Sequence, residues 1–261
     1  MAREDVLRRT AGIAMLALGL LLATSAARAQ CPIPADQFTP DPEFTSSFMT
    51  ERCRFKTSGE NPFFPLRPGW RVTLESDEAV AVVTVLRETR KVNGVRTRVV
   101  EELEFEKDGA ELVPIERSRN FFAICEQTGS VFYFGEEVDF FDPDGNPIPG
   151  TGAWRAGENG ARAGIIMPGT ILVGGGYYQE VAPESPALDK GQIVAIHAGC
   201  EAGDFTFDQQ CVEIVDTTDC DPASEDTKVY AAGVGPVADE DLEVTSFGFA
   251  KKHRHDDDDD D

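Results

Sequence analysis

The chain of 261 residues carries 24 lysines and arginines against 47 aspartates and glutamates, which gives a formal net charge of −23. A field of this sign repels nucleic acids and anionic membrane surfaces, so we expect neither as a partner. It attracts divalent cations and cationic partners, although the same charge also serves to keep a protein in solution. With 41% hydrophobic residues, the chain is long enough to bury a full core.

The N-terminus has the pattern of a secretory signal peptide. Basic residues near the start precede an apolar run over 11–23, and the small-residue box Ala27-Arg28-Ala29 follows it. The apolar run is too short for a membrane-spanning helix, so we expect no transmembrane anchor. The sequence therefore predicts cleavage after Ala29 and a periplasmic or secreted protein.

Six cysteines follow the predicted cleavage point, and an even number in an exported chain predicts three disulfides. They are Cys31, Cys53, Cys125, Cys200, Cys211 and Cys220. Their spacing suggests that Cys31 pairs with Cys53. Two of the last three cysteines would then close a local loop, leaving the third for Cys125.

Residues 30–60 are polar and rich in proline, which predicts an extended N-terminal arm. The next segment, NPFFPLRPGW at 61–70, has three prolines that exclude a helix or a central strand. Its apolar residues Phe63, Phe64 and Leu66 are expected to pack as a hydrophobic plug on the sheet that follows.

Residues 70–141 alternate between apolar and polar side chains in the manner of an antiparallel meander. Turn signals separate the strands, and Asn93-Gly94 is the strongest short hairpin signal of the chain. In the strand that follows this turn, the alternation places Val99, Leu103 and Phe105 on one face.

The stretch 131–168 combines a strand of high aromatic content over 131–141, a turn over 142–147 and a short strand at 164–168 that ends at a proline. Further strands are expected up to residue 249. The pattern predicts an all-β domain over 61–249, an antiparallel meander forming a half-barrel, barrel or sandwich. The chain ends in KKHRHDDDDDD, and we expect this tail at 250–261 to be disordered.

Several motifs occur in a fixed order: NPFFPLRPG, YFGEE, GAWRAGENGARAGIIMP, GYYQE and YAAGVGPV. In this order they resemble a family of exported bacterial proteins that open with an Asn-Pro-aromatic-Phe-Pro-Leu-x-Pro-Gly motif. The resemblance runs over about 61–249. The chain departs from the family in the position of Trp70, in its cysteines and in its acidic tail. The resemblance implies an exported β-rich domain. It assigns neither an activity nor catalytic residues to the chain.

Four residues are candidates for the wall of a ligand pocket: Trp154, Met167, Phe132 and Phe134. Apolar concave sites use such residues, and so does any core. The first hypothesis is thus a non-enzymatic protein that binds a small apolar ligand or a divalent cation. The alternative interpretation is that these residues belong to a β-hairpin and to the hydrophobic core that packs against it.

Two acidic segments are candidate calcium sites, because calcium prefers oxygen ligands. In the first, Asp142, Asp144 and Asn146 occupy alternate positions, but the glycine and glutamate of an EF-hand are missing. The second contains Asp219 and Asp221 beside Cys220. A plain turn and a solvated acidic loop are the competing interpretations. The lone histidine of a predicted strand, His197, fits a hydrogen-bonded core residue better than a metal ligand.

The motifs of serine hydrolases, zinc proteases and phosphate-binding loops are missing from the sequence. A secreted hydrolase with paired carboxylates near Glu136 and Asp139 is the second hypothesis, since such pairs can act as acid and base. The third is an envelope or extracellular interaction protein that uses its charged surface. The sequence does not predict the oligomeric state.

Overall fold

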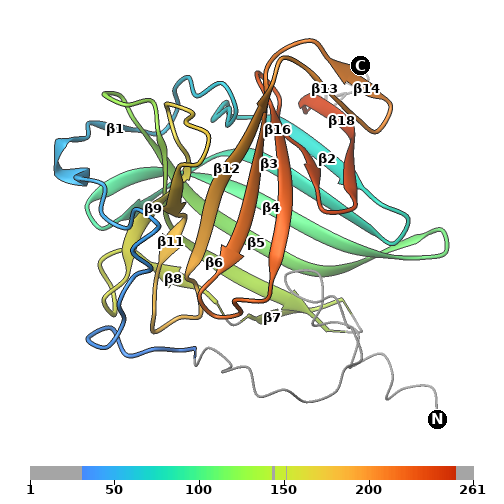
Figure 1. Ribbon diagram of the computed structural model, residues 1–261. Helices are drawn as coiled ribbons and strands as arrows, with labels where there is room; N and C mark the ends of the chain where they lie inside the picture. Colours follow the sequence, from blue (N-terminus) through green and yellow to red (C-terminus); the bar gives the residue numbers. More distant parts are fainter. Residues whose placement is uncertain (1–30, 143–144, 151, 251–261) are drawn as a thin grey trace, which may run out of the picture.

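The structure is a computed structural model, and it describes residues 31–142, 145–150 and 152–250. The predicted signal peptide and the acidic tail lie outside the described residues. Almost all regular structure is β-strand, as predicted, and Figure 1 shows one large sheet that curves round to form a nearly closed barrel. No helix in the described ranges is long and apolar enough to cross a membrane.

A single helical turn comes first in the chain, and β-strands of different lengths follow it. They are η2 (Thr50–Arg52), β1 (Phe55–Lys56), β2 (Trp70–Glu75), β3 (Ala79–Val92), β4 (Val95–Asp108), β5 (Glu111–Cys125), β6 (Val131–Phe141), β7 (Pro147–Pro149), β8 (Trp154–Arg155), β9 (Arg162–Met167), β10 (Gly176–Tyr178), β11 (Glu180–Val181), β12 (Asp189–His197), β13 (Cys200–Ala202), β14 (Phe205–Phe207), β15 (Cys211–Thr218), β16 (Glu225–Ala231), β17 (Gly235–Asp239) and β18 (Leu242–Phe249).

The sheet is antiparallel throughout its main path, which runs in the order β10-β12-β15-β16-β17-β18-β2-β3-β4-β5-β6-β9-β11. The two ends of this path meet in one segment of chain. β10 pairs with β12, and β11, which follows after Gln179 alone, pairs with β9. A single stretch of six residues therefore hydrogen-bonds to both ends of the sheet and brings the edges together.

The predicted meander is present, and its longest members β3, β4, β5 and β6 cross the barrel side by side (Figure 1). The β3–β4 turn is formed by Asn93 and Gly94, with φ of 46° and 81°. Positive φ at both central residues is what a tight two-residue hairpin requires, and asparagine and glycine tolerate it best. The turn signal in the sequence thus predicts the register Val92↔Val95 that the structure has.

The segment 61–69 packs where two later loops meet. The buried Asn61 donates from Nδ2 to the carbonyl oxygens of Gly129 and Pro168, at 2.9 and 3.1 Å. Its Oδ1 accepts from the backbone N–H groups of Phe63 and Phe64. This one side chain therefore joins the NPFFPLRPG motif to the proline that ends the GIIMP motif.

All six cysteines are paired, as predicted, and the three disulfides indicate an oxidising environment. The predicted pairing of Cys31 with Cys53 is wrong, and so is that of Cys125 with one of the last three cysteines, whereas the predicted local loop is confirmed. Cys31 is bonded to Cys220, and Cys53 to Cys125, while Cys200 and Cys211 close a local loop. The N-terminal arm is therefore tied to the barrel at two points.

The arm covers the outer face of β6. Phe132 and Phe134 on this strand point away from the barrel interior and meet the ring of Phe55 edge to face, at 5.2 and 5.1 Å between centroids. Phe48 packs on Phe132 in the same way, at 5.9 Å. Aromatic side chains of β6 therefore lie on both faces of the strand. One face packs against the N-terminal arm and the other points towards the barrel interior.

Candidate ligand-binding cavity

The barrel encloses a cavity of about 360 Å³. Apolar side chains of β2 and β3, among them Trp70, Val72 and Val85, line one part of it. The acidic lining residues are Glu102, Glu104, Glu116, Glu136, Glu180, Asp189 and Asp239, and Lys228 is their one lysine. Seven carboxyl groups around one ammonium group are unusual for a protein interior, because burial disfavours charge.

Strand alternation explains why the glutamates of β4 and β5 face inward. Successive side chains of a strand point to opposite faces, so Glu102 and Glu104 line the cavity while Leu103 between them points outward. On β5 the same rule turns Glu116 inward, together with Ser118 and Asn120. The sequence predicts the shared face of Leu103 and Phe105, but this face lies outside the barrel and the glutamates lie inside.

A bulge at Gly135 sets the inward face of β6. Phe122 pairs with Tyr133 and Asn120 pairs with Glu136, so β6 has one more residue than β5 between these points. Both Tyr133 and Glu136 therefore line the cavity although they are three residues apart. Gly135 has φ of 136°, and a Cβ there would lie 2.3 Å from the carbonyl oxygen of Trp154, so only glycine fits.

Glu102, Glu104 and Glu116 form the first acidic group. Glu104 lies directly opposite Glu116 in the pairing of β4 with β5. Burial, and after it the charge of nearby Glu102, raise the pKa of Glu104 to about 8 and that of Glu116 to about 7. Oε2 of Glu104 is buried and has no hydrogen-bond partner in the described part of the chain.

Lys228 lies beside this group, but its charge is already balanced. Its Nζ is 3.2 Å from Asp239 Oδ2 and 3.6 Å from Asp216 Oδ2. The charge of Asp239 is the main cause that raises the pKa of Lys228 above its usual value, so the side chain stays an ammonium. Burial raises the pKa of Asp216 to about 7, against the opposing effect of Lys228.

Glu136, Glu180 and Asp189 form the second acidic group. Trp154 donates from Nε1 to Glu180 Oε2 at 2.5 Å, and Tyr133 donates to Glu136 Oε2 at 3.0 Å. Glu180 and Asp189 share a hydrogen bond, and burial is the main cause that raises the pKa of each. Burial also raises the pKa of Glu136 to about 8. The carboxyls of Glu136 and Glu180 thus have protein donors, whereas Oε2 of Glu104 has none among the described residues.

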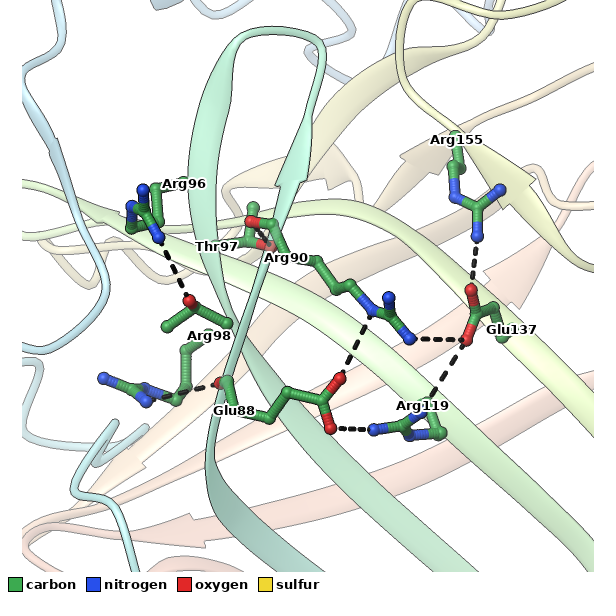
Figure 2. A network of polar contacts seen from close by, with 9 residues as sticks. Glu88, Arg90, Arg96, Thr97, Arg98, Arg119, Glu137 and Arg155 are labelled. Atoms are coloured by element: carbon green, nitrogen blue, oxygen red, sulfur yellow. Dashed lines mark hydrogen bonds and ion pairs between the residues drawn. The ribbon is translucent and has the colours of Figure 1, made fainter.

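The outer face of the same strands carries a different network, shown in Figure 2. Glu137, the neighbour of Glu136, points outward and pairs with Arg90, Arg119 and Arg155, and Glu88 pairs with Arg90 and Arg119. Exposed pairs of this kind contribute little stability each. The contrast shows that the arginines of β3 and β5 neutralise outward glutamates, whereas the inward acids have Lys228 as the one cation among the described lining residues.

The four predicted pocket residues do not border this cavity. Trp154 lines a smaller hollow of about 140 Å³ beside it and contacts two lining residues of the main cavity, by its hydrogen bond to Glu180 and by an edge-to-face contact with Tyr133. Met167 is fully buried in the core. Phe132 and Phe134 pack under the N-terminal arm, on the other face of β6.

The acidic side chains of the two predicted calcium sites make contacts with other protein groups. Asp142 accepts from the backbone N–H of Asn146 at 2.8 Å, as in a turn, and Asp144 lies outside the described residues. Asp219 accepts from Tyr178 and pairs with Lys190 at 2.7 Å. Asp221 accepts from the backbone N–H of Ala223. No group of three or more His, Cys, Asp or Glu in the described ranges could hold a metal ion.

The suggested catalytic pair of Glu136 and Asp139 is divided between the two faces of β6. Glu136 lines the cavity, whereas Asp139 points outward and pairs with Arg117 at 2.5 Å. The expectation of a core histidine is also wrong, since His197 is half-exposed and lies 3.3 Å from Glu213.

Sequence reasoning missed Glu102, Glu104, Glu116, Asp189 and Lys228. A signal was present in the alternation Val100-x-Glu102-x-Glu104, which gives one strand face two acids in a row. Such a face usually points to solvent. Comparison with protein-family models, curated proteins and solved structures gave no match.

Proposed function

We propose that the protein binds a small organic cation, a compact molecule with a positively charged nitrogen and an apolar body, inside its barrel. The observation that carries the proposal is the cavity with seven carboxyl groups and one lysine whose charge is already balanced. The charged nitrogen would lie against Glu102, Glu104 and Glu116. The apolar body would pack on Trp70, Val72 and the other side chains of β2 and β3.

An organic cation fits this interior better than a metal ion. Hard metal ions require several oxygen ligands gathered at one point, and the described residues contain no such group. The carboxyls are instead spread over the wall, next to aromatic and aliphatic side chains. A ligand of mixed character satisfies both parts of the surface, which is the usual composition of a small-molecule site.

The protein would meet this ligand outside the cytoplasm. The disulfides support an oxidising compartment, and the N-terminal pattern supports export with cleavage after Ala29. Mass spectrometry of the purified protein tests this part, because a cleaved chain begins at Gln30 and an uncleaved one retains residues 1–29.

The binding test compares probe molecules that have the same apolar part and differ in the charge of their polar group. The first set is 2-phenylethylamine, 2-phenylethanol and phenylacetate, and putrescine and choline extend the range of cations. Calorimetry at pH 8 should show that the cations bind and that the matched alcohol and carboxylate do not. Equal binding of amine and alcohol would contradict the proposal, as would failure of every cation.

The double substitution Glu104→Gln with Glu116→Gln keeps the size and polarity of the first acidic group and removes its charge. It should weaken amine binding at least tenfold. Glu101→Gln is the matched control, because Glu101 is on the same strand and points to the opposite face. The control should bind amines as the wild type does, which separates a local effect from a change in net charge.

A carboxyl-dependent hydrolase is the second candidate, favoured by the raised pKa values of Glu104 and Glu136, to about 8 each. Carboxyls with such values are suited to act as general acids near neutral pH. Turnover of glycoside or ester substrates, abolished by Glu104→Gln or Glu136→Gln, would favour this candidate over simple binding.

A further inference from the structure

We propose that the barrel exchanges protons for its ligand: the first acidic group is protonated in the empty cavity and releases protons when an organic cation enters. This inference rests on the proposed function and adds how that function is regulated. It makes the barrel a carrier that loads at neutral or alkaline pH and unloads in acid.

The geometry of the first acidic group carries the argument. Directly opposite residues of an antiparallel pair have Cβ atoms about 4.5–5.5 Å apart, and like charges at such positions repel. Glu104 and Glu116 occupy these positions with both side chains in the cavity, and Glu102 lies two residues along the same face. Three half-buried carboxylates this close in one cavity wall favour either a bound cation or protonation.

Among the described residues that line the cavity, the one positive charge near this group is that of Lys228, and acids already pair with it. Lys228 on β16 is held between Asp239 on β17 and Asp216 on β15. Tyr230 on β16, the adjacent lining residue of the same face, is uncharged, and burial raises its pKa further. The residues of β2 and β3 that line the cavity, such as Val72, Leu74 and Val83, are apolar.

The remaining neighbours are acidic as well. β6 contributes Glu136, β11 contributes Glu180 and β12 contributes Asp189, and these increase the negative charge at the site. The pKa of Glu104, about 8, and that of Glu116, about 7, agree with a group that holds protons when the cavity is empty. The arginines of the outer wall are on the other side of the sheet and pair with outward acids (Figure 2).

The charge balance of the exchange is simple. A protonated amine enters and a carboxylic acid becomes a carboxylate that accepts its N–H groups. The released proton passes to the solvent buffer, so the net charge inside the barrel does not change. A released proton makes the affinity depend on pH, with a tenfold change in dissociation constant for each pH unit below the carboxyl pKa.

Calorimetry with 2-phenylethylamine at pH 6.5 in two buffers of different ionisation enthalpy counts these protons. The amine itself stays charged at this pH, since amines of this type titrate near lysine, at about 10. We expect about one proton released for each amine bound, and affinity at pH 5.5 at least tenfold weaker than at pH 7.5. The double substitution Glu104→Gln with Glu116→Gln should reduce the proton count of the binding that remains, and Glu101→Gln should leave the count unchanged.

Each outcome decides between the two proposals. Binding of 2-phenylethylamine without proton release, with an affinity constant from pH 5.5 to pH 8, would overturn the exchange and leave the proposed function intact. Failure of 2-phenylethylamine, putrescine and choline to bind at pH 8 would overturn the proposed function itself, and the exchange with it. A proton count that stays the same in the double variant Glu104→Gln with Glu116→Gln would place the exchanged proton elsewhere and would contradict the assignment to this group.

Discussion

Glu104 on β4 and Glu116 on β5 lie directly opposite each other with both carboxyl groups inside the barrel. The outer face of β5 carries Arg117 and Arg119, which pair with the outward acids Asp139, Glu88 and Glu137. β5 thus carries these two arginines on its outer face and Glu116 on its inner face. Clustered carboxyl groups in a protein interior cost stability because burial disfavours their charged form, so we interpret the interior acids as functional.

The first prediction concerns stability and pH. The folded-state pKa of Glu104, about 8, exceeds the ordinary value of 4.5. The folded state therefore binds more protons between these values, and stability falls as the pH rises through this window. Glu104→Gln removes the penalty and should stabilise the protein at pH 8.5 by on the order of a few kcal/mol. Near pH 4.5 the difference should vanish. Denaturant unfolding at the two pH values measures it, and equal stability of variant and wild type at pH 8.5 would contradict the burial of this carboxyl.

The second prediction concerns Asn61, whose side chain makes four hydrogen bonds to three segments. Asn61→Ala leaves buried backbone groups without partners, and each such group costs about 1–3 kcal/mol. We expect the free energy of unfolding to fall by roughly 2–4 kcal/mol. Asn146→Ala, at an exposed turn, is the control and should have a small effect. A loss of stability no greater than in this control would show that Asn61 does not join the motifs.

The third prediction compares two disulfides of different loop length. Cys31 and Cys220 are 189 residues apart in sequence, whereas Cys200 and Cys211 are 11 apart. Closing the longer loop restricts the unfolded chain more, by roughly 5 against about 3 kcal/mol in the chain-entropy model. Replacing Cys31 and Cys220 by serine should therefore lower the melting temperature more than replacing Cys200 and Cys211. The opposite order would mean that native-state contacts, and not loop length, decide the contribution.

The fourth prediction concerns Trp154, which is buried and donates a hydrogen bond to Glu180. Trp154→Phe keeps most of the packing and removes the donor, so it should destabilise by about 1–3 kcal/mol. Trp154→Ala also leaves a cavity and should cost about 3–5 kcal/mol. Because Trp154 does not border the main cavity, the phenylalanine variant should still bind amines at pH 8. Loss of amine binding in a stable Trp154→Phe variant would instead place this residue in the ligand site.

Much of the fold could be predicted from local signals. The alternation of apolar and polar residues indicates the strands of the meander, and Asn93-Gly94 and Gly145 indicate two of its turns. Each of these signals depends only on residues that are neighbours in the sequence. The pairing of Cys31 with Cys220 could not be predicted, because it follows from how a sheet of 16 strands curves and closes. Local spacing contains no information about that closure.

The candidate site was the hardest part to predict, because alternation shows that two faces differ but not which one is inside. On β4, Leu103 and Phe105 indicate a core face and Glu102 and Glu104 a solvent face, and the closed sheet reverses this assignment. The bulge at Gly135 adds one residue to β6 relative to β5, so the alternation of inward and outward side chains changes there and Glu136 points inward. Only the three-dimensional closure brings these acids together.

The central claim is that the barrel holds an organic cation, and native mass spectrometry tests it most directly. Protein isolated from its own cells without chelators would be compared in native and denaturing spectra, before and after addition of the amine panel at pH 8. The account predicts an extra mass in the native spectrum that belongs to an amine and is lost in the Glu104→Gln, Glu116→Gln variant. An adduct that is a neutral or anionic molecule or a metal ion, or a barrel that stays empty with every amine added, would contradict it.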